Sequence, residues 1–189
     1  MSTAFREKYI AEPAFYRKLG RIVLPIVLQQ ILNQGAGFVD TIMVSRVGGV
    51  SAVAVATQLD WLLGPVTFGV NSGVNIYSSQ FYGAKDEKSL KKCFGFSMLM
   101  SLLIALVFFL LAALAGQSVL RFYSTDSEIV RLGWRYLRIV CFGYLFSAVT
   151  SAFTFAYRSV QRTKIPMYIG FGINVINACL NYVLIFGKL

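Results

Sequence analysis

The chain has 189 residues and a mean hydropathy of +0.65, and only 14% of its residues are charged. Soluble domains have about 25% charged residues, so this composition excludes an ordinary soluble domain and predicts a membrane protein. The net charge of +10 does not indicate a nucleic-acid partner, because the basic residues lie mainly in short polar links between apolar stretches.

Five apolar stretches predict an all-α fold, a polytopic transmembrane helix bundle. The predicted spans cover residues 19–45, 50–80, 93–116, 134–158 and 166–187, each close to or above the roughly 20 residues that cross a bilayer. Residues 1–18 form a charged N-terminal segment without the apolar core and cleavage site of a signal peptide, so the first span is expected to be retained.

Basic residues predict the orientation of the bundle. Two-thirds of the 18 Lys and Arg residues lie in the first 21 residues and at or in the links after the second and fourth spans. The positive-inside rule therefore places the N-terminus in the cytoplasm, and the amphipathic piece 117–131 outside. Transporters are commonly built from repeated bundles, so a chain with five spans is expected to be cut short before a sixth.

The first span carries polar side chains where lipid would favour none. They form two lines along the predicted helix: Gln29, Asn33 and Asp40 on one, and Gln30, Gln34 and Thr41 on the other. An ionised, unpaired carboxylate at the centre of a span costs about 2.5 kcal/mol or more. We therefore predict a functional role for Asp40, as a protonated acid, a cation partner or a group facing water.

Other spans also have polar stripes. Each stripe occupies one side of a predicted helix: Gly170, Asn174, Asn177 and Asn181 in the fifth span, Asn71, Asn75 and Ser78 in the second, and Tyr144, Ser147, Ser151 and Thr154 in the fourth. We expect Asn71, Asn75 and the serines to join helices by hydrogen bonds. The third span is almost uniformly apolar and is expected to face mostly lipid. Asp60 is a second acid within a span, and either a functional or an interfacial role remains open for it.

Metal-dependent and enzymatic chemistry are not indicated. Cys93, Cys141 and Cys179 lie singly and far apart, and the chain has no histidine, so neither a zinc site nor a disulfide framework is expected. The sequence has no phosphate-binding glycine loop and no Ser-His-Asp set. We expect no enzymatic activity and no cofactor. We expect the energy for any transport to come from an ion gradient or a partner.

Four segments resemble the multidrug and toxic compound extrusion (MATE) family. They are Leu24 to Gly48, which includes Phe38-Val39-Asp40-Thr41, then residues 79–86 after the second span, residues 157–167 before the fifth, and residues 177–187 within it. Their order and spacing match the family over essentially the whole chain. The resemblance implies a transporter with two six-helix bundles around a cavity that opens alternately to each side, of which residues 19–189 would supply five helices of the first.

The resemblance also implies a function and a site. Members export cationic or amphipathic drugs in exchange for Na⁺ or H⁺, so small organic cations, one of these ions, the lipid bilayer and a second bundle are the expected partners, in the cell membrane. The implied site residues are Asp40, Asn177, Asn181 and Tyr136, and we add Gln34 from the polar side of the first span. Some members carry an acid at the position of Asn181, which leaves the coupling ion open.

These residues suggest a mechanism. A protonated Asp40 would hydrogen-bond to Asn177 or Asn181, whereas an ionised Asp40 would hold Na⁺ beside both asparagines or attract an organic cation. Competition for one carboxylate would couple the two fluxes.

Two alternatives remain. One is a lipid-linked oligosaccharide flippase of related architecture, which would need a strongly basic cavity, whereas the spans offer at most Arg135 and Arg138. The other is an inactive, truncated membrane fragment.

Overall fold

The computed structural model of the chain describes residues 12–45 and 49–185, without the side chains of five of them: Asp40, Met43, Val44, Leu184 and Ile185. Within these ranges all regular secondary structure is α-helical, as predicted. The helices are α2 (Pro13–Ser45), α3 (Val50–Ala56), α4 (Gln58–Gly83), α5 (Glu87–Tyr123), α6 (Ser127–Val140), α7 (Gly143–Ser159) and α8 (Lys164–Ile185).

Several helices are long and apolar enough to cross a membrane. They are Pro13–Val39 of α2, the α3–α4 segment Val50–Gly83, and α5; α6 and α7 together form a fourth candidate, bent by 51° at its break. These helices confirm a membrane helix bundle. Over its described residues α8 is not among the candidates, so the fifth span stays a prediction.

The predicted span boundaries differ from the helices. The predicted fourth span, 134–158, is two helices, because the chain breaks between Val140 and Gly143. The amphipathic piece 117–131 is not one element either: its first part continues α5, and the remainder follows a turn and starts α6. At that turn Asp126 caps α6 by accepting hydrogen bonds from the backbone N–H groups of Glu128 and Ile129.

Helix α5 is longer than the predicted third span because its polar start is capped. Asp86 accepts a hydrogen bond of 3.1 Å from the backbone N–H of Ser89. Hydrogen bonds from the side chain and backbone of Ser89 lower the pKa of Asp86, so this cap is ionised at neutral pH. The helix therefore begins at Glu87, in the charged link that follows α4, rather than at residue 93.

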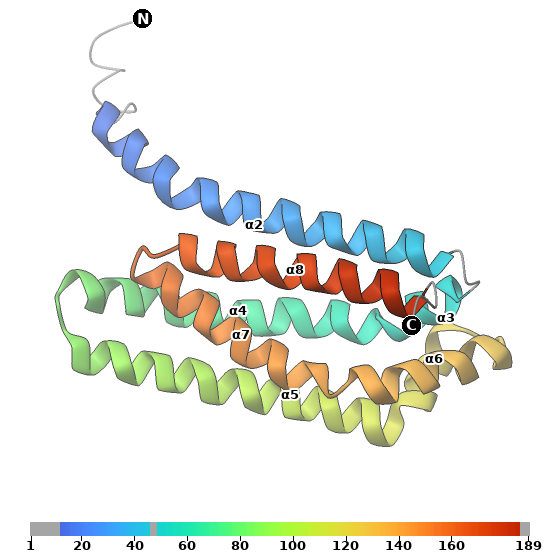
Figure 1. Ribbon diagram of the computed structural model, residues 1–189. Helices are drawn as coiled ribbons and strands as arrows, with labels where there is room; N and C mark the ends of the chain where they lie inside the picture. Colours follow the sequence, from blue (N-terminus) through green and yellow to red (C-terminus); the bar gives the residue numbers. More distant parts are fainter. Residues whose placement is uncertain (1–11, 46–48, 186–189) are drawn as a thin grey trace, which may run out of the picture.

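The helices form two layers (Figure 1). In the larger layer α5 packs against α4 and α7, while α3 and α6 pack together at one end. In the other layer α2 and α8 lie side by side and run in the same direction (Figure 1). Contacts between the two layers are sparse in comparison with those within each layer.

Small residues let α5 occupy the centre of the larger layer. They line one face of the helix and are buried: Ser97, Ser101, Ala105, Ala112 and Gly116. The opposite face carries large exposed side chains such as Leu114, which is 83% exposed. The prediction that this helix faces lipid is therefore right for one face, and the other face is a close helix-packing surface.

Hydrogen bonds across this surface confirm the role predicted for Asn71. The fully buried Asn71 side chain donates to the Ser101 hydroxyl at 2.8 Å and accepts from the Ser97 hydroxyl. Both serines lie on α5, so one amide joins α4 to α5 with its donor and its acceptor both used.

We predict that Gly116→Ala lowers the free energy of unfolding by about 1–3 kcal/mol, because overpacking strains a filled interface. A Cβ atom at Gly116 would lie 2.5 Å from the ring of Trp134 on α6. The measurement is equilibrium unfolding of the purified protein in detergent with increasing dodecyl sulfate. Gly95→Ala is the matched control, since nothing lies within 4 Å of a Cβ atom there. Equal stability of the two variants would show that α5 and α6 do not approach closely at Gly116.

Candidate functional site

A line of polar side chains joins α2 to α8, and we call Gln29, Asn33 and Asn174 the polar seam. Gln29 is only 8% exposed, and its Nε2 donates to the backbone oxygen of Pro166 at 3.3 Å. Two helical turns further along α8, the Nδ2 of Asn174 donates to the Oδ1 of Asn33 at 3.1 Å. Amide groups therefore hold the two helices together where a lipid-facing pair would have only apolar contacts.

A glycine makes room for the first contact of the seam. A Cβ atom at Gly170 would lie 3.5 Å from the Nε2 of Gln29, in ordinary van der Waals contact. The larger side chain of any residue beyond alanine would therefore compete with Gln29 for this space. The polar stripe predicted for the fifth span thus has a glycine and an asparagine that face α2.

Arg158 belongs to the same site, although the sequence indicates for it only a positive charge next to a link. Arg158, at the end of α7, donates from Nη2 to the Oε1 of Gln29 at 3.2 Å, and its guanidinium carbon lies 5.3 Å from the centre of the Phe155 ring. Gln29 therefore contacts both α7 and α8. The spacing of Phe155 and Arg158 on one helix face could have suggested the cation–π contact. Nothing in the sequence indicates the contact with Gln29.

The seam fixes how the two helices are aligned. Its contacts join residues 137 positions apart at Gln29 and Pro166, and 141 positions apart at Asn33 and Asn174. Because α2 and α8 run in the same direction (Figure 1), this offset holds approximately along the pair.

The predicted site residues lie in different parts of this arrangement. The backbone of Asp40 belongs to α2, but its side chain lies outside the described residues. Asn177 and Asn181 follow Asn174 along α8, and the Nδ2 of Asn181 donates to the Oδ1 of Asn177 at 3.0 Å. Gln34 is exposed on α2, as is the rest of its line, Gln30 and Thr41.

Tyr136 is not brought to the seam. It lies on α6, which packs against α3 and α5 and does not contact α2 or α8 among the described residues. A role for Tyr136 beside Asp40 therefore remains a prediction with no support from the helix packing.

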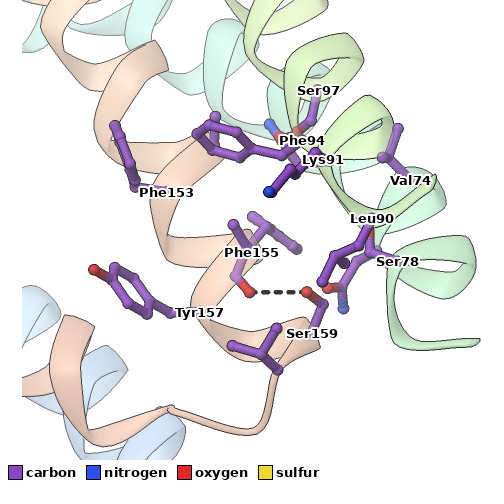
Figure 2. Close-up of a pocket in the computed structure, with 15 residues that line it drawn as sticks. Val74, Ser78, Leu90, Lys91, Phe94, Ser97, Phe153, Phe155, Tyr157 and Ser159 are labelled. Atoms are coloured by element: carbon purple, nitrogen blue, oxygen red, sulfur yellow. Dashed lines mark hydrogen bonds between the residues drawn. The ribbon is translucent and has the colours of Figure 1, made fainter. Parts of the chain in front are cut away.

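A separate hollow of about 290 Å³ lies between α4, α5 and α7 (Figure 2). Aromatic side chains border it, including Phe94 and Phe153, whose ring centres are 5.1 Å apart. Lys91 and Ser159 also contribute to its wall, and no Asp or Glu is among the described residues that line it. Because it has no acidic group, this hollow does not resemble a cation site.

Comparison with known proteins identifies the family. The family model MatE matches residues 25–183, which is most of the chain. The chain belongs to the MATE family. This result confirms the resemblance seen in the four sequence segments.

Several curated relatives are similar to nearly the whole chain. The probable multidrug resistance protein YoeA of Bacillus subtilis is 29% identical over 94% of this chain and 39% of its own length. The probable multidrug resistance protein NorM of Xanthomonas campestris is 32% identical over 91% of the chain and 38% of its own. The probable multidrug resistance protein NorM of Thermotoga maritima is 22% identical over 93% of the chain and 38% of its own length. The chain thus spans about two-fifths of the length of these relatives. No solved structure matches it.

We predict that Asn33 and Asn174 are energetically coupled by about 0.6–2 kcal/mol, because each amide would otherwise lack its partner within the bundle. The measurement is a double-mutant cycle of Asn33→Ala and Asn174→Ala, using the free energy of unfolding in detergent. A cycle that pairs Asn33→Ala with Ser79→Ala is the control, since the Ser79 hydroxyl donates within α4 to the backbone oxygen of Ile76. Additive effects of Asn33→Ala and Asn174→Ala would contradict the contact.

Proposed function

We propose that the MATE protein containing this chain exports cationic or amphipathic drugs in exchange for Na⁺ or H⁺, with Asp40 as the carboxylate that ion and drug share. Family membership and the names of the relatives support drug efflux, which is transport rather than enzymatic catalysis. The observation that carries the assignment to Asp40 is the alignment of α2 with α8.

That alignment supports a shared site in the following way. An offset of 137 to 141 positions makes residue 40 level with residues 177 to 181 of α8. Asn177 and Asn181 occupy this stretch and provide amide oxygen and nitrogen atoms. An acid and two amides at one level of a helix pair would supply both a hydrogen-bonding partner for the protonated acid and oxygen ligands for Na⁺.

The exposed polar line of α2 supports a cavity next to this site. Gln30, Gln34 and Thr41 are exposed in this chain, while Gln29 and Asn33 face α8. Polar side chains in a span avoid lipid and face water or protein. We therefore assign this line to a cavity wall that a second six-helix bundle would close.

The coupling mechanism follows from competition for one charge. When Asp40 is ionised, it attracts an organic cation from the cytoplasm or holds Na⁺ beside Asn177 and Asn181. When it is protonated or holds Na⁺, the organic cation loses its counter-charge and is released. Exchange requires that ion and drug favour different conformations of the bundles, because a ligand shifts an equilibrium only by its differential affinity. The N-terminus is cytoplasmic in this arrangement, in the cell membrane.

The flippase alternative has one observation in its favour, the half-buried Arg158 next to the seam. Its guanidinium already contacts Gln29 and Phe155. One engaged arginine is a weak site for a pyrophosphate, which several cations would need to neutralise.

We predict that Asp40→Asn in the natural full-length protein reduces drug export to background while expression is unchanged, because the amide keeps the shape of the side chain and removes its charge. Export is measured as loss of a fluorescent cation from loaded cells. The matched control is Glu128→Gln, which removes an acid whose ion pair with Arg131 is exposed and contributes little. Normal export by Asp40→Asn would exclude the shared-carboxylate mechanism.

A second experiment separates a transporter from an inactive fragment. The 189-residue chain is expressed alone and is expected to export no drug, because one bundle cannot form both walls of an alternating cavity. Export by the chain alone would contradict the need for a second bundle.

A further inference from the structure

A second acid lies in a cavity of the larger layer, away from the polar seam. The cavity has a volume of about 340 Å³ and lies between α4 and the α6–α7 break. Its polar lining comprises Asp60 and Thr67 of α4 and Tyr144 and Ser147 of α7. The remaining lining residues are apolar or glycine, and no Lys or Arg is present among the described side chains that form this wall.

The charge of Asp60 has no cation beside it in this cavity. The residue is half-buried within the apolar segment Val50–Gly83. Its position in the first turn of α4 favours an anion, but the group that the described chain brings to its carboxylate is the Tyr144 side chain of α7. A helix terminus alone therefore does not account for an acid at this place.

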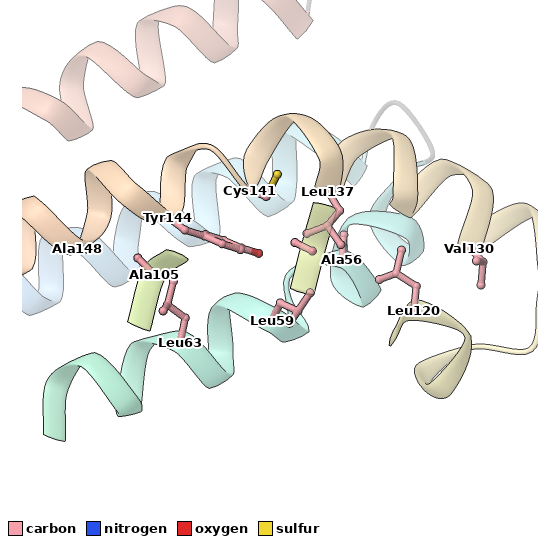
Figure 3. Close-up of a cluster of buried hydrophobic side chains, with 11 residues drawn as sticks. Ala56, Leu59, Leu63, Ala105, Leu120, Val130, Leu137, Cys141, Tyr144 and Ala148 are labelled. Atoms are coloured by element: carbon pink, nitrogen blue, oxygen red, sulfur yellow. The ribbon is translucent and has the colours of Figure 1, made fainter. Parts of the chain in front are cut away.

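Tyr144 gives an independent indication of a ligand. Its side chain is only 2% exposed, and Figure 3 shows its ring extending from α7 over Leu59 and Leu63 of α4. The hydroxyl lies close to Asp60, yet no described group forms a hydrogen bond of ordinary geometry with it. The interaction of this hydroxyl with Asp60 therefore falls short of a well-formed hydrogen bond, and a cation placed between the two oxygen atoms would satisfy both.

The oxygen atoms around the cavity match a small hard cation. Asp60 supplies a carboxylate, and Tyr144 and Ser147 supply hydroxyl oxygens from successive turns of one helix face. The hydroxyl of Thr67 donates to the backbone oxygen atoms of Leu63 and Gly64 at 2.9 Å, which leaves its lone pairs available. A single carboxylate neutralises a monovalent ion, whereas a divalent ion would keep an uncompensated charge in apolar surroundings.

We propose that Asp60, Tyr144 and Ser147 form a second monovalent-cation site, between α4 and α7, that binds Na⁺. The site goes beyond the exchange proposed at Asp40, because it uses another carboxylate in the other helix layer. A bound ion would link α4 to α7 next to the α6–α7 break and so stabilise the bend. The other titratable groups that act on Tyr144 are Cys141 and Tyr136, and neither carries a positive charge.

Binding of radioactive ²²Na⁺ to the purified full-length protein tests this site. The measurement uses Asp40→Asn as the background, so that any ion held at the seam is removed first. We expect Na⁺ binding to persist in Asp40→Asn, and one bound ion per protein to be lost in the double variant Asp40→Asn/Asp60→Asn. Tyr144→Phe in the same background should weaken the affinity about tenfold, through loss of one oxygen ligand. Asp40→Asn/Glu128→Gln is the charge-matched control and should bind as Asp40→Asn does.

Each outcome decides between the two proposals. No Na⁺ binding by Asp40→Asn, or equal stoichiometry and affinity with and without Asp60→Asn, would overturn the second site. Drug export by Asp40→Asn would instead overturn the shared carboxylate and leave the Na⁺ result at Asp60 intact. Size-exclusion chromatography of Tyr144→Phe, which keeps the aromatic ring, shows whether a loss of binding comes from the missing oxygen or from misfolding.

Discussion

The hydrogen bonds that side-chain amides form between α2 and α8 are the constraint on which the functional arrangement depends. In hydrocarbon, apolar side chains do not drive two helices together, so the polar contacts of Gln29, Asn33 and Asn174 are what make this pair specific. They also select one alignment, because sliding either helix by one residue would turn the amides away from their partners. This alignment determines which polar residues of α2 and α8 lie at the same position along the helix axes.

The larger layer is held together differently. Its centre is the face of α5 formed by small residues, where close backbone approach and the Asn71–Ser97–Ser101 hydrogen bonds join α5 to its neighbours. Arg158 connects the two layers by its contact with Gln29, at the end of α7. Dense packing within each layer and sparse packing between them suit a bundle in which the α2–α8 pair moves as a unit, as alternating access would require.

Much of this architecture could be predicted from the sequence, because hydrocarbon strongly restricts the possibilities. Long apolar stretches must be helices, since no water is available to satisfy an open backbone, and polar stripes such as Asn174–Asn181 must face protein or a cavity. The four motif segments then indicated the family, which the family model confirmed. The prediction that Asn71 joins helices is confirmed by its bonds to two serines of α5.

The rest depended on information that one sequence does not contain. The offset between α2 and α8, and the meeting of Gln29 with Arg158, are contacts between residues more than 100 positions apart. The break between α6 and α7 has no proline to signal it, and the extension of α5 depends on a cap outside the apolar stretch. The sequence shows Asp60 and Tyr144 as polar residues of two spans, but their proximity arises only when α4 packs against α7.

The most direct measurement of the central claim is the proximity of residue 40 to residues 177–181. Native cysteines are first replaced by alanine, and a short bifunctional thiol reagent is then applied in membranes to Asp40→Cys/Asn177→Cys and Asp40→Cys/Asn181→Cys. Asn33→Cys/Asn174→Cys serves as the reference, since these two side chains are in contact. Cross-linking of at least one test pair as readily as the reference is the expected result. Cross-linking of the reference pair alone would show that the acid lies away from the asparagines of α8.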